Sequence, residues 1–197
     1  MNKPFSQACE NNKDPILSVL RRVFNRPREV LEIGSGTGQH AVYFATHLPH
    51  VSWQPSDLAI HLPGINSWLD EARLENIKAP IALDINHKPW PVSDIEAVFT
   101  ANTLHIMSWE SVRVFIQSLG ETMQSGAKFC CYGPFNVGGT YTSESNARFD
   151  IWLKEQDSLS AIRDLDTVVS LANDAGIQLL ENIEMPAHNK LLVLEKT

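Results

Sequence analysis

The sequence predicts an α/β fold with a mostly parallel sheet, helices on both faces and one antiparallel strand. Short apolar runs alternate with stretches in which apolar residues recur at helical spacing. The run from Val30 to Ile33 leads into three glycines and then a helical pattern, which predicts a strand, a tight turn and a helix. Near the end, two apolar runs are joined by a turn too short for a parallel crossover, so these two strands should be antiparallel neighbours.

Seven strands are predicted, each from an apolar run bounded by polar or turn-forming residues. They cover residues 30–33, 51–54, 81–84, 95–101, 127–132, 177–185 and 190–196. Helices are predicted between them from apolar residues at helical spacing, with Ser108 and Asp164 as N-caps of two of the later ones. We expect the first helix to begin at Asp14 and Pro15. Residues 5–13 are either a loose terminus or a segment that folds over a ligand.

The length and composition predict one domain over residues 1–197. The chain is 43% hydrophobic and 20% charged, with a net charge of −7. Without a basic stripe, nucleic acid is a poor candidate partner.

No apolar run reaches the length of a membrane span and the start lacks a leader-like pattern, so we expect a cytoplasmic protein without a membrane partner. The histidines and cysteines lack metal-ligand spacing, so no metal is implied, and the oligomeric state is left open.

The glycine-rich turn predicts a binding site for a nucleotide-like cofactor. Gly34, Gly36 and Gly38 allow a tight turn and a close approach of the backbone to a ligand. The dinucleotide fingerprint needs its third glycine three residues after the second, and Gln39 occupies that position. A nicotinamide cofactor is therefore disfavoured.

Polar residues close the next predicted strands. Asp57 follows Gly38 by nineteen residues, the spacing at which a βαβ unit carries an acidic residue that binds ribose hydroxyls. The alternative is that Asp57 is the N-cap of the next helix. Asp84 closes the third strand and is alternatively an ordinary loop-capping residue. Asn102 follows the fourth strand.

These residues together resemble those of class I S-adenosylmethionine-dependent methyltransferases. The first motif of that class, E-x-G-x-G-x-G, matches Glu32 and the three glycines, and Asp57, Asp84 and Asn102 follow at successive strand ends. The resemblance covers nearly the whole chain. The strings EIGSGTGQHAVYFA, WQPSDL, ANTLHIMSW and SNARFD are more narrowly similar to the family catalogued as domain of unknown function 938, also called the methyltransferase-like protein 26 family.

The resemblance implies a Rossmann-like class I methyltransferase fold with S-adenosylmethionine as the cofactor. The glycine turn would pack against the methionine part, and Glu32 would orient its amino group. Asp57 would contact the ribose, Asp84 the adenine amino group and Ile85 the adenine ring, while Asn102 would lie where substrate meets cofactor. The family's substrate is unassigned, so the resemblance implies no particular reaction.

The function predicted is methyl transfer to an unidentified acceptor. A small molecule is the first candidate because the chain is acidic and too short for a separate recognition domain, and a protein side chain or terminus is the second. The tetrapeptide of amino-methylating enzymes is absent, since Asn102 is followed by Thr103-Leu104-His105. The alternative is a non-catalytic S-adenosylmethionine-binding sensor or interaction protein.

Three residues are candidates for the reaction itself. His105 follows the fourth strand and titrates near neutrality, so it is the candidate base; packing between Leu104 and Ile106 is the alternative. Asn102 would contact both ligands. Tyr132 would form an apolar wall, although core packing explains it equally well.

Residues 134–163 form a long insertion that we expect to act as a lid over the substrate. Phe149, Trp152 and Leu153 have the spacing of one buried helix face that would anchor it. The predicted substrate residues are Asn146, Arg148 and Asp150 in the insertion and Asn12 in the opening segment. The alternative is that the helix only covers the sheet, with Arg148 and Asp150 at the surface.

Overall fold

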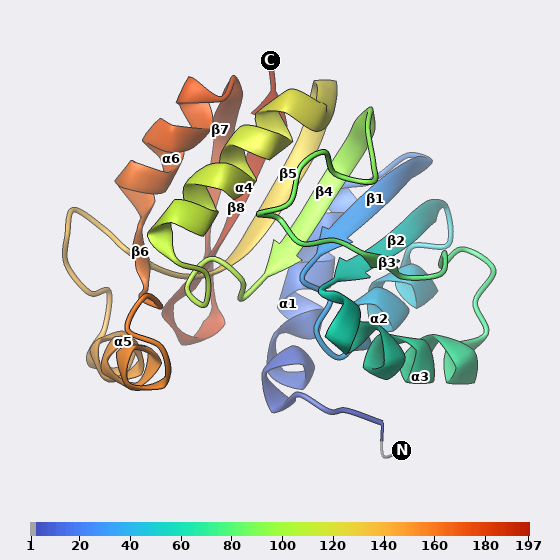
Figure 1. The fold of residues 1–197 in the computed structure, drawn as a ribbon, viewed down its shortest axis with the longest axis horizontal. Coiled ribbons are helices and arrows are strands. Elements are labelled where there is room, and N and C mark those ends of the chain that lie inside the picture. The colour runs from blue at the N-terminus through green and yellow to red at the C-terminus, as the bar shows by residue number, and fades with distance from the viewer. Residues whose placement is uncertain (1–2) are drawn as a thin grey trace. The chain divides into compact units, whose positions relative to one another are not determined.

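The computed structural model, drawn in Figure 1, describes residues 3–197. These residues fall into two compact units, of which the first ends at Thr100 and the second begins at Ala101. Each unit contains its own strands and helices, and they are described separately below.

The first unit contains the strand–turn–helix segment and three further strands. Its elements are α1 (Gln7–Val23), β1 (Arg28–Ile33), α2 (Gln39–His47), β2 (Val51–Asp57), η1 (Ala59–His61), α3 (Leu62–Ala72), β3 (Ile81–Ala82) and β4 (Ile95–Ala101). The strands pair in parallel in the order β3-β2-β1-β4. Helix α2 packs against α1 on one side and α3 on the other. Parallel pairing places the carboxyl ends of β1, β2 and β3 at one edge.

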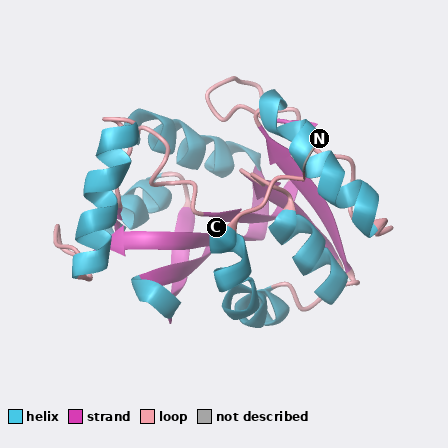
Figure 2. Cartoon of the chain, turned by 90° about the horizontal axis from the view of Figure 1, so that it is seen from below, coloured by secondary structure: helices cyan, strands magenta, loops and turns pink. Residues whose placement is uncertain are grey.

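The second unit contains the antiparallel part of the fold. Its elements are α4 (Trp109–Thr122), β5 (Met123–Asn136), α5 (Glu144–Gln156), β6 (Arg163–Asp164), α6 (Leu165–Asp174), β7 (Ile177–Met185), η2 (Pro186–His188) and β8 (Asn189–Lys196). Strand β8 lies between β5 and β7 and runs antiparallel to both, whereas β6 pairs in parallel with β5. Helices appear in cyan and strands in magenta in Figure 2.

The predicted fold class is confirmed: the chain is α/β, its sheet is mostly parallel, and β8 is the antiparallel strand. Ser108 and Asp164 cap α4 and α6 as predicted, each accepting a hydrogen bond from a backbone amide. Five strand lengths differ from the prediction: β3 is shorter, and β1, β2, β5 and β8 are longer. The two-residue strand β6 was not predicted from the sequence.

The predicted start of the first helix is wrong. Helix α1 begins at Gln7, where the Ser6 hydroxyl accepts a hydrogen bond from the Cys9 amide at 3.4 Å, and Pro15 lies inside the helix. A proline suits the first helical position because its missing N–H has no helical partner there. The same residue in a helix interior removes one hydrogen bond. The segment 5–13, left open from the sequence, is therefore mostly helical.

The predicted buried face of α5 is also wrong at Trp152. The buried residues of this helix are Asn146, Asp150 and Leu153, whereas Trp152 is 51% exposed. Two polar side chains thus face inward, which apolar periodicity alone does not reveal.

The core of the first unit is aromatic. Phe44 of α2, Trp53 of β2 and Phe99 of β4 are fully buried, and their ring centroids lie 5.2–5.8 Å apart. Within the described residues no helix is long and apolar enough to cross a membrane.

Candidate functional site

The glycine turn has the backbone geometry that its sequence predicts. Gly34, Gly36 and Gly38 have φ values of 75°, 57° and 89°, in the left-handed region where side chains are strained. The amides of Gly34 and Ser35 both donate to the Ser56 carbonyl at 3.0 Å, which fixes the turn to the end of β2.

Gly38 is also required by packing. A Cβ at this position would lie 3.1 Å from Cα and 3.3 Å from the carbonyl oxygen of Ile65 in α3. The third glycine of the motif therefore lets α3 approach the start of α2 closely.

Glu32 is a buried carboxyl directly beneath the turn. It is 2% exposed, and its Oε2 accepts hydrogen bonds from Ser35 Oγ at 2.9 Å and Trp53 Nε1 at 3.0 Å. Among residues 3–197, Oε1 has no hydrogen-bond partner. Burial raises the pKa of Glu32 to about 7; the two hydrogen bonds act against that shift, and the charge of Asp57 adds to it.

Asp57 connects the end of β2 with the turn. Its Oδ2 accepts a hydrogen bond from the Gly36 amide at 2.7 Å, and its Oδ1 accepts one from the Leu58 amide at 2.7 Å. The helical turn η1 that follows has Leu58 as its N-cap residue. The structure thus brings Glu32, the glycines and Asp57 together, as the sequence predicts for residues at adjacent strand ends.

Asp84 follows β3 and caps its own loop. Its carboxylate accepts a hydrogen bond from the Asn86 amide at 2.9 Å and contacts His87 Nδ1 at 2.7 Å. The Asn86 amide is the main reason that the pKa of Asp84 lies below its ordinary value. Ile85 is 8% exposed, and its carbonyl accepts a hydrogen bond from Trp90 Nε1. The adenine contacts assigned to Asp84 and Ile85 stay predictions.

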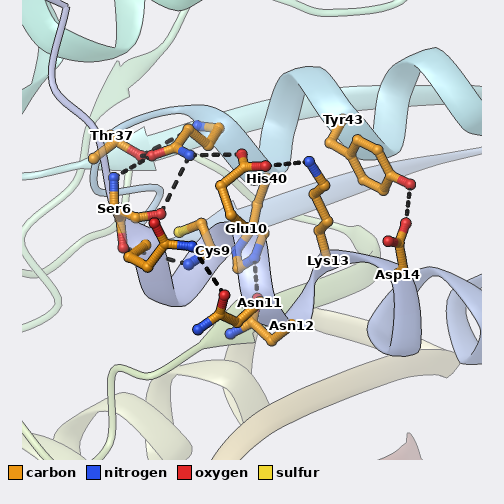
Figure 3. A network of polar contacts seen from close by, with 12 residues as sticks. Ser6, Cys9, Glu10, Asn11, Asn12, Lys13, Asp14, Thr37, His40 and Tyr43 are labelled. Atoms are coloured by element: carbon orange, nitrogen blue, oxygen red, sulfur yellow. Dashed lines mark hydrogen bonds and ion pairs between the residues drawn. The ribbon is translucent and has the colours of Figure 1, made fainter.

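The start of α1 is bound to the start of α2 through a polar network (Figure 3). The Gln39 side chain accepts from the Ser6 amide at 2.5 Å and from Thr37 Oγ1 at 3.0 Å, and it donates to the Ser6 carbonyl and to Glu10. Gln39 is 4% exposed. One buried amide therefore fixes the opening segment beside the glycine turn.

Asn12, a predicted substrate residue, belongs to the same network. Its Oδ1 contacts His40 Nε2 at 2.7 Å, and both side chains are buried. Burial lowers the pKa of His40 to about 4, so the ring is neutral at pH 7 and donates to the Asn12 oxygen. In this structure the Asn12 oxygen serves the contact between α1 and α2.

The second unit contains the candidate residues for the reaction. Asn102 has a φ of 59°, and its amide donates to the Tyr132 carbonyl at 2.9 Å. A non-glycine residue in this region is uncommon, and such residues cluster at functional sites. The Tyr132 side chain is buried in β5.

His105 is 6% exposed, and its ring has no hydrogen-bond partner among residues 3–197. Its ring stacks edge-on with Phe149 of α5, with centroids 5.3 Å apart. Burial, reinforced by the positive charge of Arg163, lowers the pKa of His105 to about 4. The imidazole is neutral at pH 7, with one donor and one acceptor nitrogen.

The predicted substrate residues of the insertion lie in different environments. Asn146 donates to Thr142 Oγ1 at 2.9 Å and to the His188 carbonyl at 3.2 Å. Asp150 is 2% exposed and accepts hydrogen bonds from three donors, which are the Ile162 amide, Tyr141 Oη and Lys154 Nζ. The Arg148 side chain is 73% exposed and pairs with Glu144 at 3.8 Å. Their roles in substrate binding stay predictions.

Sequence reasoning missed the residues that support the turn. These are Ser6, Gln39, Trp53 and Ser56. In the second unit it missed Arg163, which donates to the carbonyls of Leu104 and Met107 beside His105. The one sequence signal was Ser6, a residue type favoured at N-caps, but Asp14-Pro15 offered a stronger helix-start pattern. Within the described residues no three His, Cys, Asp or Glu side chains form a group that could hold a metal ion.

Solved structures with the same fold include O-methyltransferases and the S-adenosylmethionine-dependent methyltransferase SibL. An O-methyltransferase family protein from Burkholderia thailandensis superposes with a TM-score of 0.81 at 14% identity, over 94% of this chain and 56% of that chain. An O-methyltransferase family 2 protein from Planctomyces limnophilus, solved with apigenin, superposes with a TM-score of 0.82 at 14% identity. The match covers 95% of this chain and 58% of that chain. PigF, solved with SAH, superposes with a TM-score of 0.80 at 17% identity, and the match covers 92% of this chain and 55% of that chain.

The chain therefore has the Rossmann-like class I methyltransferase fold, and it spans little more than half the length of these proteins. Residues 3–196 match the family described as "Protein of unknown function (DUF938)", and the chain belongs to that family. The family resemblance drawn from the sequence motifs is confirmed, and so is the fold that it implies.

Proposed function

We propose that this protein transfers the methyl group of S-adenosylmethionine to a small-molecule acceptor. The observation that carries the proposal is the group formed by Glu32, the glycine turn and Asp57, which come from adjacent strand ends of the first unit. The fold supports it, since the similar structures are methyltransferases and include one solved with SAH. The absence of a basic stripe favours a small molecule over nucleic acid.

The residues present fit this cofactor. A buried carboxyl with one oxygen lacking a protein partner favours a cationic hydrogen-bond donor, and the amino group of S-adenosylmethionine is such a donor. Asp57 would accept hydrogen bonds from the ribose, while Asp84 and Ile85 would contact the adenine. When bound, the cofactor supplies a methyl group on a positively charged sulfur.

The second unit would orient the acceptor. Asn102 offers an amide and His105 a neutral imidazole, so together they can hold a hydroxyl group and receive its proton. Because its conjugate acid has a pKa of about 4, His105 is a weak base, and it would take the proton only once bonding to the methyl group has made the O–H strongly acidic. Tyr132 would line the site. We propose a cytoplasmic location.

The test is transfer of labelled methyl groups. Purified protein is incubated with S-adenosylmethionine labelled in the methyl group and with fractionated cell extract, and Asp57→Ala serves as the control. The proposal predicts label in the low-molecular-mass fraction with the wild type and much less with the variant. Label only in nucleic acid or protein would overturn the small-molecule acceptor, and label in no fraction would favour a non-catalytic binding protein.

A further inference from the structure

Gly133 in β5 is a glycine that the fold itself does not require. All ten glycines of the chain lie in the described part. Seven have positive φ, and these are Gly34, Gly36, Gly38, Gly126, Gly138, Gly139 and Gly176. Gly64 and Gly120 are closely packed, since a Cβ there would approach Pro4 to 2.9 Å and Ala175 to 2.5 Å.

Gly133 has neither property. Its φ lies outside the positive region, and a Cβ would meet its nearest side-chain atoms at ordinary contact distance, 3.9 Å from Asn102 Oδ1 and 3.9 Å from His105 Nδ1. Alanine would therefore fit without strain. Its absence leaves a space the size of a methyl group between two polar atoms.

Those two polar atoms lack partners within the protein. Among residues 3–197 neither the Asn102 side chain nor the His105 ring makes a hydrogen bond, although His105 is only 6% exposed. Neither atom is fully enclosed, so a ligand group can reach both of them. A small polar group above Gly133 would satisfy both atoms.

Aromatic side chains lie next to this space. Phe149 packs edge-on with the His105 ring, and Trp152 stacks on Phe149 with an interplanar angle of 13° and centroids 5.8 Å apart. The three rings form a row from the buried His105 to the half-exposed Trp152. Ring faces and edges of this kind bind planar aromatic groups favourably.

The loop that carries His105 is held along its length. Four consecutive carbonyls, those of residues 104–107, accept hydrogen bonds from residues 160–163. The donors are Arg163 Nε to residue 104 at 3.2 Å, the Ala161 amide to residue 105 at 3.0 Å, Ser160 Oγ to residue 106 at 3.1 Å and an Arg163 terminal nitrogen to residue 107. Asp150 of α5 accepts from the Ile162 amide at 2.6 Å. One segment thus connects α5 and the His105 loop, which keeps the site preorganised.

The polarity of the site selects the bound group. The neutral imidazole offers one donor and one acceptor, and Asn102 Oδ1 is an acceptor. A hydroxyl group satisfies this pair because it both donates and accepts, whereas a carboxylate would face the Asn102 oxygen without a proton to donate.

We propose that Gly133, Asn102 and His105 form a subsite for the hydroxyl group of a planar aromatic molecule whose ring lies along Phe149 and Trp152. The subsite specifies the acceptor class of the proposed methyl transfer and rests on that function for its role, but binding itself needs no cofactor. Gly133 is then a glycine because a side chain there would narrow the space through which the ligand hydroxyl reaches Asn102 and His105.

The test uses 2-naphthol as the probe and NMR as the readout, without cofactor. We expect 2-naphthol to shift the His105 ring resonances and to bind with a dissociation constant of about 1 mM, as befits a fragment of this size. Gly133→Ala should weaken binding at least about tenfold, because its methyl group narrows the space beside Asn102 and His105 that the hydroxyl must enter. Unfolding by urea and binding of S-adenosylhomocysteine should not change in this variant.

Matched ligands and variants separate the two parts of the subsite. 2-Methoxynaphthalene has the same ring system without the O–H donor and should bind more weakly than 2-naphthol. Trp152→Ala should weaken 2-naphthol binding, whereas Ile151→Ala, which removes a neighbouring side chain of 58% exposure on the same helix, should not. Asn102→Ala provides a second test at the polar pair if Gly133→Ala does not fold.

The proposal is overturned if 2-naphthol does not bind at millimolar concentration or leaves the His105 resonances in place. Equal binding to the wild type and Gly133→Ala, with the variant folded, overturns it too. Failure of the proposed function is a separate result: S-adenosylhomocysteine would not bind, whereas the 2-naphthol result would stand.

Discussion

Glu32→Gln is predicted to remove a pH dependence from the folding free energy. In the folded protein the pKa of Glu32 is raised to about 7 from its ordinary value of 4.5, mainly because the carboxyl is buried. Between these pH values the folded state holds a proton that the unfolded state has released. This stabilisation is fully present below pH 4.5 and is lost as the pH rises through 7.

The size of the effect follows from the interval between the two pKa values. One pKa unit corresponds to about 1.4 kcal/mol, so the interval corresponds to about 3 kcal/mol of unfolding free energy. The carboxyl is fully buried, so solvent screening does not reduce this figure much. Glutamine keeps an oxygen for the hydrogen bonds from Ser35 and Trp53 but cannot titrate.

The assay is urea unfolding of wild type and Glu32→Gln at several pH values between 4.5 and 7.5. Subtracting the variant's free energy from that of the wild type cancels the titration of other groups, and the difference should fall by about 3 kcal/mol across this range. Saturating S-adenosylhomocysteine should flatten the fall, because its ammonium group favours the charged carboxylate. A difference that stays constant with pH would refute the buried, protonated Glu32.

Three further predictions concern other parts of the two units. Asp57→Ala should weaken S-adenosylhomocysteine binding by about 1–3 kcal/mol in titration calorimetry, because ribose hydroxyls lose their acceptor; unchanged affinity would remove Asp57 from the site. Gln39→Leu should lower the unfolding free energy by about 1–3 kcal/mol, since the Ser6 amide and carbonyl lose their partner, and an unaltered urea midpoint would contradict this role. Arg163→Gln should raise the His105 pKa measured by NMR titration, because a neighbouring positive charge is removed; a fixed midpoint would show that burial alone sets it.

The elements that carry the glycine turn could be predicted because each left a local signal. Gly34, Gly36 and Gly38 have the positive φ that their sequence pattern predicts, and Ser108 and Asp164 cap helices as their residue types indicate. The reversed strand β8 followed from the short turn before it. Local chemistry fixes these features, so the sequence alone suffices.

Features that depend on distant contacts could not be predicted in this way. Pro15 resembled a helix start, but α1 extends back to Ser6 because Gln39, far along the chain, binds that segment. Asp150 faces inward because the Ile162 amide, Tyr141 and Lys154 donate to it. The spacing of apolar residues along the helix contains no information about such polar partners. Asp84 differs, because its partner is the amide of the nearby Asn86. The sequence analysis could therefore offer loop capping as the alternative role of Asp84.

The measurement that tests the central claim most directly is calorimetric titration of the purified protein with S-adenosylmethionine, S-adenosylhomocysteine and a nicotinamide dinucleotide. Our interpretation predicts saturable binding of the first two at one site per chain, release of a proton from Glu32 near pH 7, and no binding of the dinucleotide. Absence of binding by both adenosyl compounds, or preferential binding of the dinucleotide, would contradict the assignment of the glycine turn as a methyl-donor site.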